Sequence, residues 1–425
     1  MQGSDAARKR LVIALNAARE DVVSKDELRE AVMAHSNGSS ERDRKYRNVA
    51  ILVKGLSDFE PFFKYDGSWL SLGWAHKSIS MHFFAATLLN NMLHGNDAEA
   101  SIEFLQQILK KNCLMAGWYS AILGIEVDMP VEIDYQDKKL KIIPFDLLSG
   151  SAQENLTPPR DVLWHLPSVS KTPLGQMPTA AIALSHVVSP LVRSTDPDLV
   201  NQVTIDAKES FEIMNDVISV LSLLGPSCPI AVKQWFEYDD RVIEHVFNFQ
   251  GTAGFLPHLY VMPLSHSPKK IEITEAQTLI TTFLKITDRA FRARLILSLN
   301  RFNQALRLAV NGGVVDLAIA LEAILGDSDN TGEIAHKIST RAALLASETL
   351  PERQRIFKQV KNLYTKRSKI VHGTRTSDKS SKIELNQIQE EFDRDKILVQ
   401  LVIRKILDFG KIPDWSTLEL GDSLI

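Results

Sequence analysis

An arginine and a histidine near the end of one segment are the residues whose types and spacing best suit chemistry. Within LYTKRSKIVHG, residues 363–373, Arg367 precedes His372 by five positions and Gly373 follows directly. Glycine is the usual residue just past a helix end, so His372 is expected where a helix stops. An imidazole changes protonation near neutral pH, as general acid–base catalysis requires. A histidine that only ends a helix is the structural alternative.

Arg367 interrupts an apolar stripe. The stripe has helical spacing and consists of Ile356, Val360, Leu363 and Ile370, with Arg367 four after Leu363 and three before Ile370. A charge at such a position is costly unless it is paired, hydrated in a cleft, or facing a partner subunit. A buried Arg367–Glu322 pair with a purely structural role is the alternative to a functional arginine.

The stretch resembles the R-x4–6-H signature of HEPN (higher eukaryotes and prokaryotes nucleotide-binding) domains, and in particular the Apea-like group. Three further marks of that group occur in its order: Asn300-Arg301-Phe302, an ALEAIL helix at 320–325 that contains Glu322, and RAALL at 341–345. All of them lie within residues 276–412, under a third of the chain. At one position the chain differs: Ser368 follows the arginine where many catalytic members have Asn, Asp or His.

The resemblance implies a metal-independent endoribonuclease that works without a cofactor and as a homodimer, with two motifs meeting in a cleft at the dimer interface. Such proteins act as toxins or in abortive anti-phage defence. His372 would transfer the proton of the RNA 2′-hydroxyl, and Arg367 would bind the phosphate. The supporting residues would be Ser368, Tyr364 and Glu322, and the RNA-binding residues Lys361, Lys366, Lys369 and Arg375. For Tyr364 a core position in the apolar row Phe357–Tyr364–Val371 is the alternative.

The fold class expected is multidomain and mainly α. Residues 276–412 read as an antiparallel bundle of the HEPN type, because short loops join long helical segments. The segments expected are 276–309, 314–325, 332–347, 351–372 and 384–409, punctuated by Gly312-Gly313, Gly326, Pro351 and Gly373. A tail, 413–425, follows.

Residues 115–275 are richer in proline and in strand-like segments, which indicates an α+β domain. We expect this domain to be a sensor or substrate-binding module. MPVEIDYQDKKLKIIPF alternates and predicts a hairpin around Gln136-Asp137. The other strand candidates are TAAIALSHVV, IAVKQWFEYDD, VIEHVFNFQG and PHLYVMPL. One helix over 211–224 follows a 3.6-residue period.

Residues 1–75 read as three helices and a hairpin around Asp66-Gly67, which resembles a winged helix-turn-helix. Such a domain binds either DNA or a protein partner. The DNA-facing candidates on its third helix are Arg42, Arg44, Lys45 and Arg47. Residues 76–114 predict a helical hairpin linker that turns at Gly95.

Charge is distributed unevenly in the chain of 425 residues, whose net charge is −3. Residues 285–411 carry 23 Lys and Arg against 15 Asp and Glu, a balance that favours polyanions, although a solvated helix face is the plainer interpretation. The sequence has no P-loop motif, paired zinc-ligand motif, nucleophile elbow or apolar run of membrane length. No metal and no membrane contact are expected, and we expect a cytoplasmic protein.

Two other classes of function remain open on the sequence. One is a DNA-binding transcriptional regulator whose HEPN bundle only dimerises and binds nucleotides or a partner. The other is a catalytically idle scaffold. Loss of RNA cleavage on changing Arg367 or His372 separates both from the ribonuclease.

Overall fold

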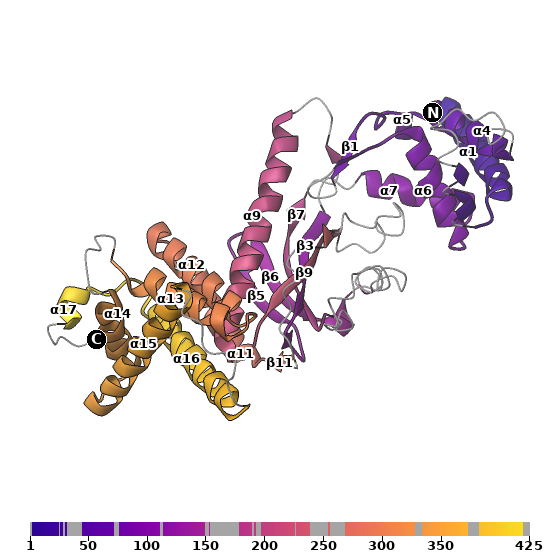
Figure 1. Cartoon of the computed structure of the whole chain (residues 1–425). Coiled ribbons are helices and arrows are strands. Elements are labelled where there is room, and N and C mark those ends of the chain that lie inside the picture. The colour runs from indigo at the N-terminus through magenta and orange to yellow at the C-terminus, as the bar shows by residue number, and fades with distance from the viewer. Residues whose placement is uncertain are drawn as a thin grey trace. The chain divides into compact units, whose positions relative to one another are not determined.

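A computed structural model gives the fold, which is mainly helical (Figure 1). It describes residues 2–24, 26–28, 30–31, 45–71, 76–110, 114–148, 153, 178–188, 191–192, 197–225, 227–238, 254–255, 268–327, 334–372 and 382–419. Arg42, Arg44, Gly373, Arg375 and the strand candidates VIEHVFNFQG and PHLYVMPL lie outside these residues. No helix in the described ranges is both long and apolar enough to cross a bilayer.

The chain divides into two compact units, each built from three separate segments. The first unit comprises Met1–Tyr119, Leu184–Phe211 and Trp235–Gly254, and the second comprises Ser120–Ala183, Glu212–Gln234 and Phe255–Ile425. The divisions fall inside helices or strands, not in linkers.

Helices dominate the first unit. They are α1 (Gln2–Asp21), α4 (Arg47–Ser57), α5 (Glu60–Phe63), α6 (Met81–Leu93) and α7 (Ala98–Leu109). α1 packs on α4, α4 on α6, and α6 on α7. Within 76–114 the expected two helices are present as α6 and α7, and Gly95, with φ +97°, turns the chain between them. Residues 76–78 belong to β2. The Asp97 side chain caps α7 by accepting from the amide of Ala100 at 2.7 Å.

The hairpin expected around Asp66-Gly67 is wrong. The strands that pair are β1 (Trp69–Ser71) and β2 (His76–Ser78), which lie further along the chain, and β1 also pairs with β8 (Leu191–Val192). The residues assigned to the first strand form α5 instead. Pro61 occupies the first turn of that helix, where a missing amide proton costs nothing, and this outweighs the aromatic residues' preference for a strand.

A six-stranded sheet has the order β10-β9-β3-β7-β6-β5. Its strands are β3 (Leu114–Leu123), β5 (Val131–Tyr135), β6 (Lys138–Pro144), β7 (Ala180–Val188), β9 (Ile230–Tyr238) and β10 (Gly254–Phe255). The hairpin expected around Gln136-Asp137 is confirmed: β5 and β6 pair antiparallel, with Tyr135 opposite Lys138. β4 (Ile125–Glu126) pairs separately with β11 (Lys269–Lys270). The helix expected over 211–224 is the second half of α9 (Pro197–Leu221), followed by a short 3-10 turn, Ser222–Leu224.

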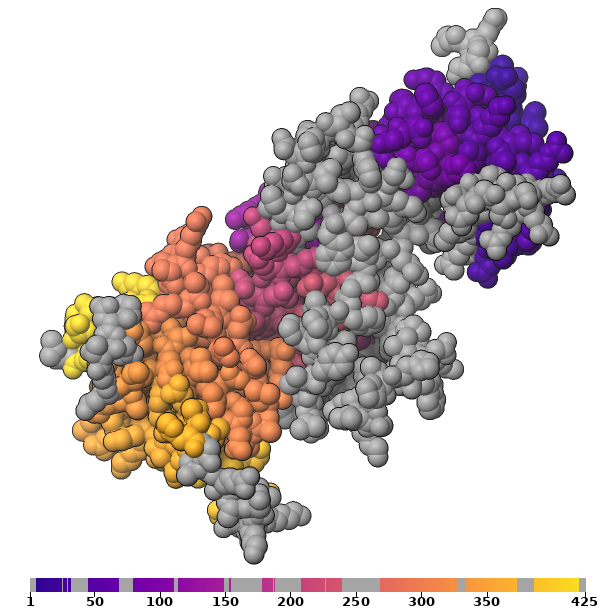
Figure 2. Space-filling view, turned by 45° about the horizontal axis from the view of Figure 1, so that its top comes forward, coloured from indigo at the N-terminus to yellow at the C-terminus, as the bar shows by residue number. Residues whose placement is uncertain are grey.

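The second unit contains a helical bundle, which forms one continuous orange-to-yellow body in Figure 2. Its helices are α11 (Ile273–Leu284), α12 (Arg289–Ala305), α13 (Val310–Leu325), α14 (Ile334–Ala346), α15 (Leu350–Val371) and α16 (Lys382–Phe409), with the short α17 (Trp415–Glu419) after them. α13 is the central helix and packs against α12, α14, α15 and α16. The helix expected over 276–309 is two helices, because the Asp288 side chain accepts from the amides of Ala290 and Phe291 and so starts a new one.

Gly312 and Gly313 do not separate two helices, as the sequence suggested, but lie in the first turn of α13. The reason is close packing. A Cβ on Gly313 would overlap the ring of Phe392, a buried residue of α16, and lie 3.0 Å from the carbonyl oxygen of Ala305. Gly313 therefore allows α13 and α16 to approach closely.

We expect Gly313→Ala to lower the free energy of unfolding by about 1–3 kcal/mol, because overpacking outweighs alanine's better helix propensity. Gly312→Ala is the matched control, since its Cβ would meet only the flexible side chain of Leu308, at 3.2 Å. Denaturant unfolding of both variants measures the difference. Equal stability of the two variants would contradict this account of the contact.

Candidate active site

Arg367 lies on α15 where the buried part of the helix ends. Ile356, Val360 and Leu363 are buried, as the stripe predicts, whereas the Arg367 side chain is 35% exposed. Its Nη1 lies 3.3 Å from Oε1 of Glu322 on α13, in an ion pair. Its Nε is buried and has no hydrogen-bond partner among the described residues. One carboxylate therefore holds the guanidinium at the rim of the bundle without satisfying all of its donors.

Tyr364 lies beneath this ion pair. It is buried, its hydroxyl is 3.5 Å from the carbonyl oxygen of Ala318, and its ring centroid is 6.0 Å from Cζ of Arg367. Burial, together with the charge of Glu322 and a hydrogen bond to it, raises the pKa of Tyr364 above its usual range. The hydroxyl is thus a proton donor that helps to orient Glu322, while the ring belongs to the core.

His372 caps α15. Its backbone amide donates to the carbonyl oxygen of Ser368 at 3.0 Å, and the residue is exposed. The helix end is where the sequence predicted it. An exposed imidazole at a helix end is accessible to a large substrate.

The lysines proposed to bind RNA differ in their surroundings. Lys361 is exposed, as are Lys369 and Ser368. The Nζ of Lys366 instead lies 2.9 Å from Glu391 and 3.3 Å from the buried Asp395, both on α16. Burial lowers the pKa of Lys366, but these two carboxylates outweigh burial and the pKa is raised. Lys366 is therefore committed to the bundle, and Lys361 and Lys369 differ from it in being exposed.

Of the candidates for DNA binding, two are described. Lys45 pairs with Oε2 of Glu30 at 3.4 Å, and both side chains are exposed. Arg47 is exposed at the start of α4.

The Asn300-Arg301-Phe302 segment has a structural part in the bundle. Oδ1 of Asn300 accepts from the hydroxyl of Ser219 at 2.9 Å, and Nη1 of Arg301 lies 3.1 Å from Oδ1 of the buried Asp316. Phe302 is buried. These three residues fix α12 against α9 and α13.

The structure thus brings Arg367, Glu322 and Tyr364 together and places His372 on the same helix. Among the residues that the structure describes, no group of three or more His, Cys, Asp or Glu side chains is suited to hold a metal ion. The sequence analysis named Asn300 but not the polar residues near it, Asn303, Gln304 and Arg307, which follow at helical spacing at the end of α12 and just beyond it. Comparison with protein-family models, curated proteins and solved structures finds no match to this chain.

Proposed function

We propose that the chain is a homodimeric endoribonuclease of the HEPN type, with Arg367 and His372 as its catalytic residues. The observation that carries the proposal is the position of Arg367: a guanidinium at the rim of an apolar stripe, anchored by Glu322 and followed on the same helix by an exposed histidine. A structural ion pair alone does not account for the buried Nε of Arg367, which has no partner among the residues that the structure describes.

The apolar residues beside the motif support a second subunit at this place. Ile370 continues the stripe beyond Arg367 and is only partly buried, and Val371 is 62% exposed. Pairing of two α15 ends would cover these side chains and bring two Arg367–His372 motifs together.

Such a site cleaves RNA by an internal displacement. His372 of one subunit removes the proton from a 2′-hydroxyl, whose oxygen attacks the adjacent phosphorus. The bond from phosphorus to the 5′-oxygen then breaks, and His372 of the partner subunit protonates the leaving oxygen. Arg367 stabilises the charge that develops on the phosphoryl oxygens. The products are a 2′,3′-cyclic phosphate and a 5′-hydroxyl.

Lys361 and Lys369 lie on the exposed side of α15 and would guide the RNA backbone. Unrestricted cleavage of cellular RNA arrests growth, so the biological role that we propose is a toxin or an abortive-infection effector. The rest of the chain would then sense the trigger or restrain the nuclease.

The test is to map RNA 5′-hydroxyl ends in cells after expression of the wild-type protein and of His372→Ala. We expect new ends with the wild type and none with the variant, because the proton-transfer group is gone. Asn362→Ala is the control, since Asn362 is an exposed residue of the same helix. Identical ends with wild type and His372→Ala would refute the assignment.

A further inference from the structure

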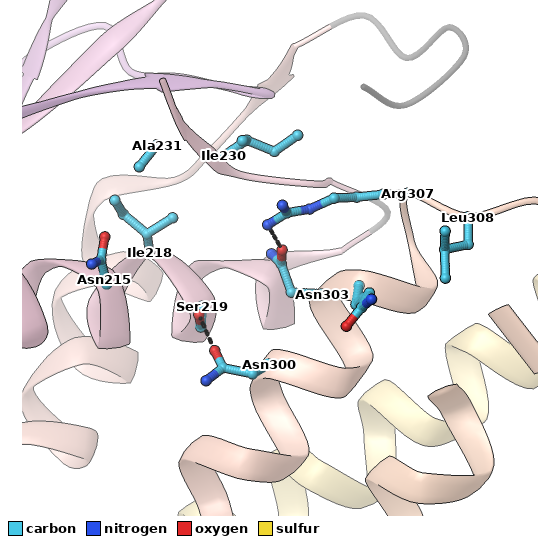
Figure 3. A pocket seen from close by; sticks show the side chains of 10 residues that line it. Asn215, Ile218, Ser219, Ile230, Ala231, Asn300, Asn303, Arg307 and Leu308 are labelled. Carbon is cyan, nitrogen blue, oxygen red and sulfur yellow. Dashed lines mark hydrogen bonds between the residues drawn. The ribbon is translucent and has the colours of Figure 1, made fainter. Parts of the chain in front are cut away.

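A pocket of about 480 Å³ lies within the second unit, between α9, the start of β9, and the end of α12 (Figure 3). Its polar lining consists of Asn215, Ser219, Asn300, Asn303, Gln304 and Arg307. Its apolar lining consists of Ile218 on α9, Ile230 and Ala231 on β9, and Leu308. Its volume falls in the range that holds a small molecule, and a few polar groups beside apolar walls are typical of such sites.

The positive charge of Arg307 has no described counter-ion. Its Nη2 donates to Oδ1 of Asn303, and no carboxylate lies within ion-pair distance of it among the described residues. Its Nε is buried and has no hydrogen-bond partner there. In Figure 3 the guanidinium extends from the end of α12 over Asn303, between the helix and Ile230. Arg307 also interacts with the thiol of Cys228, which is buried and neutral. A guanidinium that is partly withdrawn from water and has no counter-ion among the described residues favours an anion.

Asn303 holds this guanidinium in place. It is 2% exposed, and its Nδ2 donates to the carbonyl oxygen of Pro229 at 3.1 Å, which orients Oδ1 toward Arg307. The floor of the pocket therefore contains the buried Asn303 side chain, whose amide nitrogen and oxygen are both hydrogen-bonded. This arrangement is present without a ligand, so binding requires no free energy to order it.

Amide groups line the rest of the pocket. Oδ1 of Asn300 accepts a hydrogen bond from the Ser219 hydroxyl at 2.9 Å. Its Nδ2 takes no part in this bond and remains as a donor (Figure 3). Asn215 and Gln304 are exposed at the mouth. Amides donate and accept hydrogen bonds and so suit a ligand with polar groups along its body, not a bare ion.

We propose that this pocket binds a small organic anion: its carboxylate or phosphate group pairs with Arg307, and its polar body lies among the amides of α9 and α12 against Ile218 and Ile230. This site is separate from the Arg367–His372 motif, and it does not depend on the ribonuclease assignment. Its walls come from a helix and strand of the sheet region and from a helix of the bundle, so the ligand joins these two parts of the second unit.

The experiment is calorimetric titration of the full chain with four probes: inorganic phosphate, adenosine monophosphate, citrate and adenosine. We expect binding of adenosine monophosphate or citrate, with inorganic phosphate weaker and adenosine not binding. Preference for adenosine monophosphate would assign a phosphate ligand, and preference for citrate a carboxylate ligand. Binding of none of the three anions by the wild type would overturn the proposal.

Variants locate the site. Arg307→Gln should weaken binding by at least about tenfold, since a charge pair is lost. Arg289→Gln removes an exposed arginine from the first position of α12, the helix that Arg307 follows, and should bind like the wild type. Asn215→Asp places a repelling carboxylate at the exposed mouth without touching the Asn303 network, and should also weaken binding. Unchanged affinity in both Arg307→Gln and Asn215→Asp would contradict the location.

Discussion

Purified protein with Arg367→Ala is expected to cleave RNA about 10²–10³-fold more slowly than the wild type. The variant lacks the guanidinium hydrogen-bond donors that stabilise the negative charge developing on the phosphoryl oxygens. The fold should persist. Glu322 loses its ion-pair partner but keeps the hydrogen bond from Tyr364, and at 27% exposed it remains hydrated. Arg367→Lys should recover little activity, since an ammonium does not reproduce two parallel hydrogen bonds.

Arg355→Ala is the matched control for this prediction. Arg355 is on the same helix, is exposed, and pairs only locally, with Glu352 at 2.6 Å. It should cleave at nearly the wild-type rate. Sedimentation of each variant separates loss of chemistry from loss of the dimer: an Arg367→Ala protein that dimerises but does not cleave fits the proposal. Cleavage at the wild-type rate would remove Arg367 from the active site.

Arg341→Ala is expected to lower the free energy of unfolding by about 2–3 kcal/mol, because hydrogen bonds from a buried guanidinium are lost while Asp327 and Glu419, with side chains 36% and 35% exposed, stay hydrated. The Arg341 side chain is 5% exposed. Two of its nitrogens lie 2.8 Å from the two carboxylate oxygens of Asp327, and its Nε lies 2.9 Å from Oε1 of Glu419. It also donates to the carbonyl oxygen of Leu325 at 2.7 Å, and its Cζ is 5.0 Å from the ring centroid of Trp415.

The arginine thus joins the end of α13 to α14 and α17, and the variant loses all these contacts, although Lys337 still lies 4.0 Å from Asp327. Denaturant unfolding at neutral pH measures the loss.

The hydrogen bonds from Arg341 hold the pKa of Asp327 below its usual value, although burial opposes them. A depressed carboxyl pKa contributes stability above its unfolded value, near 3.8, and the contribution is lost as the pH falls through the lower, folded value. The difference between wild type and variant should therefore shrink below about pH 4. A loss under about 1 kcal/mol at neutral pH would mean that the network is dispensable.

Alternating and helical patterns of apolar residues predict strands and helices reliably where one face of the element is exposed to water. The β5–β6 hairpin alternates along both strands and was predicted, as was the buried stripe of α15. β3 was not predicted as a strand. Eight of its ten residues are buried, so its sequence, LMAGWYSAIL, shows no alternation. A strand enclosed on both faces has lost the signal on which the prediction rests.

Prediction of functional residues from the sequence depended in the same way on a visible contrast between polar and apolar positions. The odd position of Arg367 was visible because a charge breaks an apolar row, and Glu322 was named as its partner. The pocket at Arg307 was invisible for the opposite reason. Asn300, Asn303 and Gln304 on α12 and Arg307 just after it form a polar row, and a polar row is the usual sign of a face turned to water. Only the tertiary contacts of Asn303 and Ser219 reveal that part of this row is buried.

The two units share their secondary structure, and this bears on how the protein can be divided. β3, β7, α9 and β9 each begin in one unit and end in the other. Most domains can be separated by one cut in a linker, but no single scission releases either unit here. Truncation at residue 120 would sever β3 in its middle, and excising the bundle would strip Asn303 from Pro229. Reporter fusions and split-protein designs therefore need insertion points in exposed loops, and a cut at a boundary between the two units is not suitable.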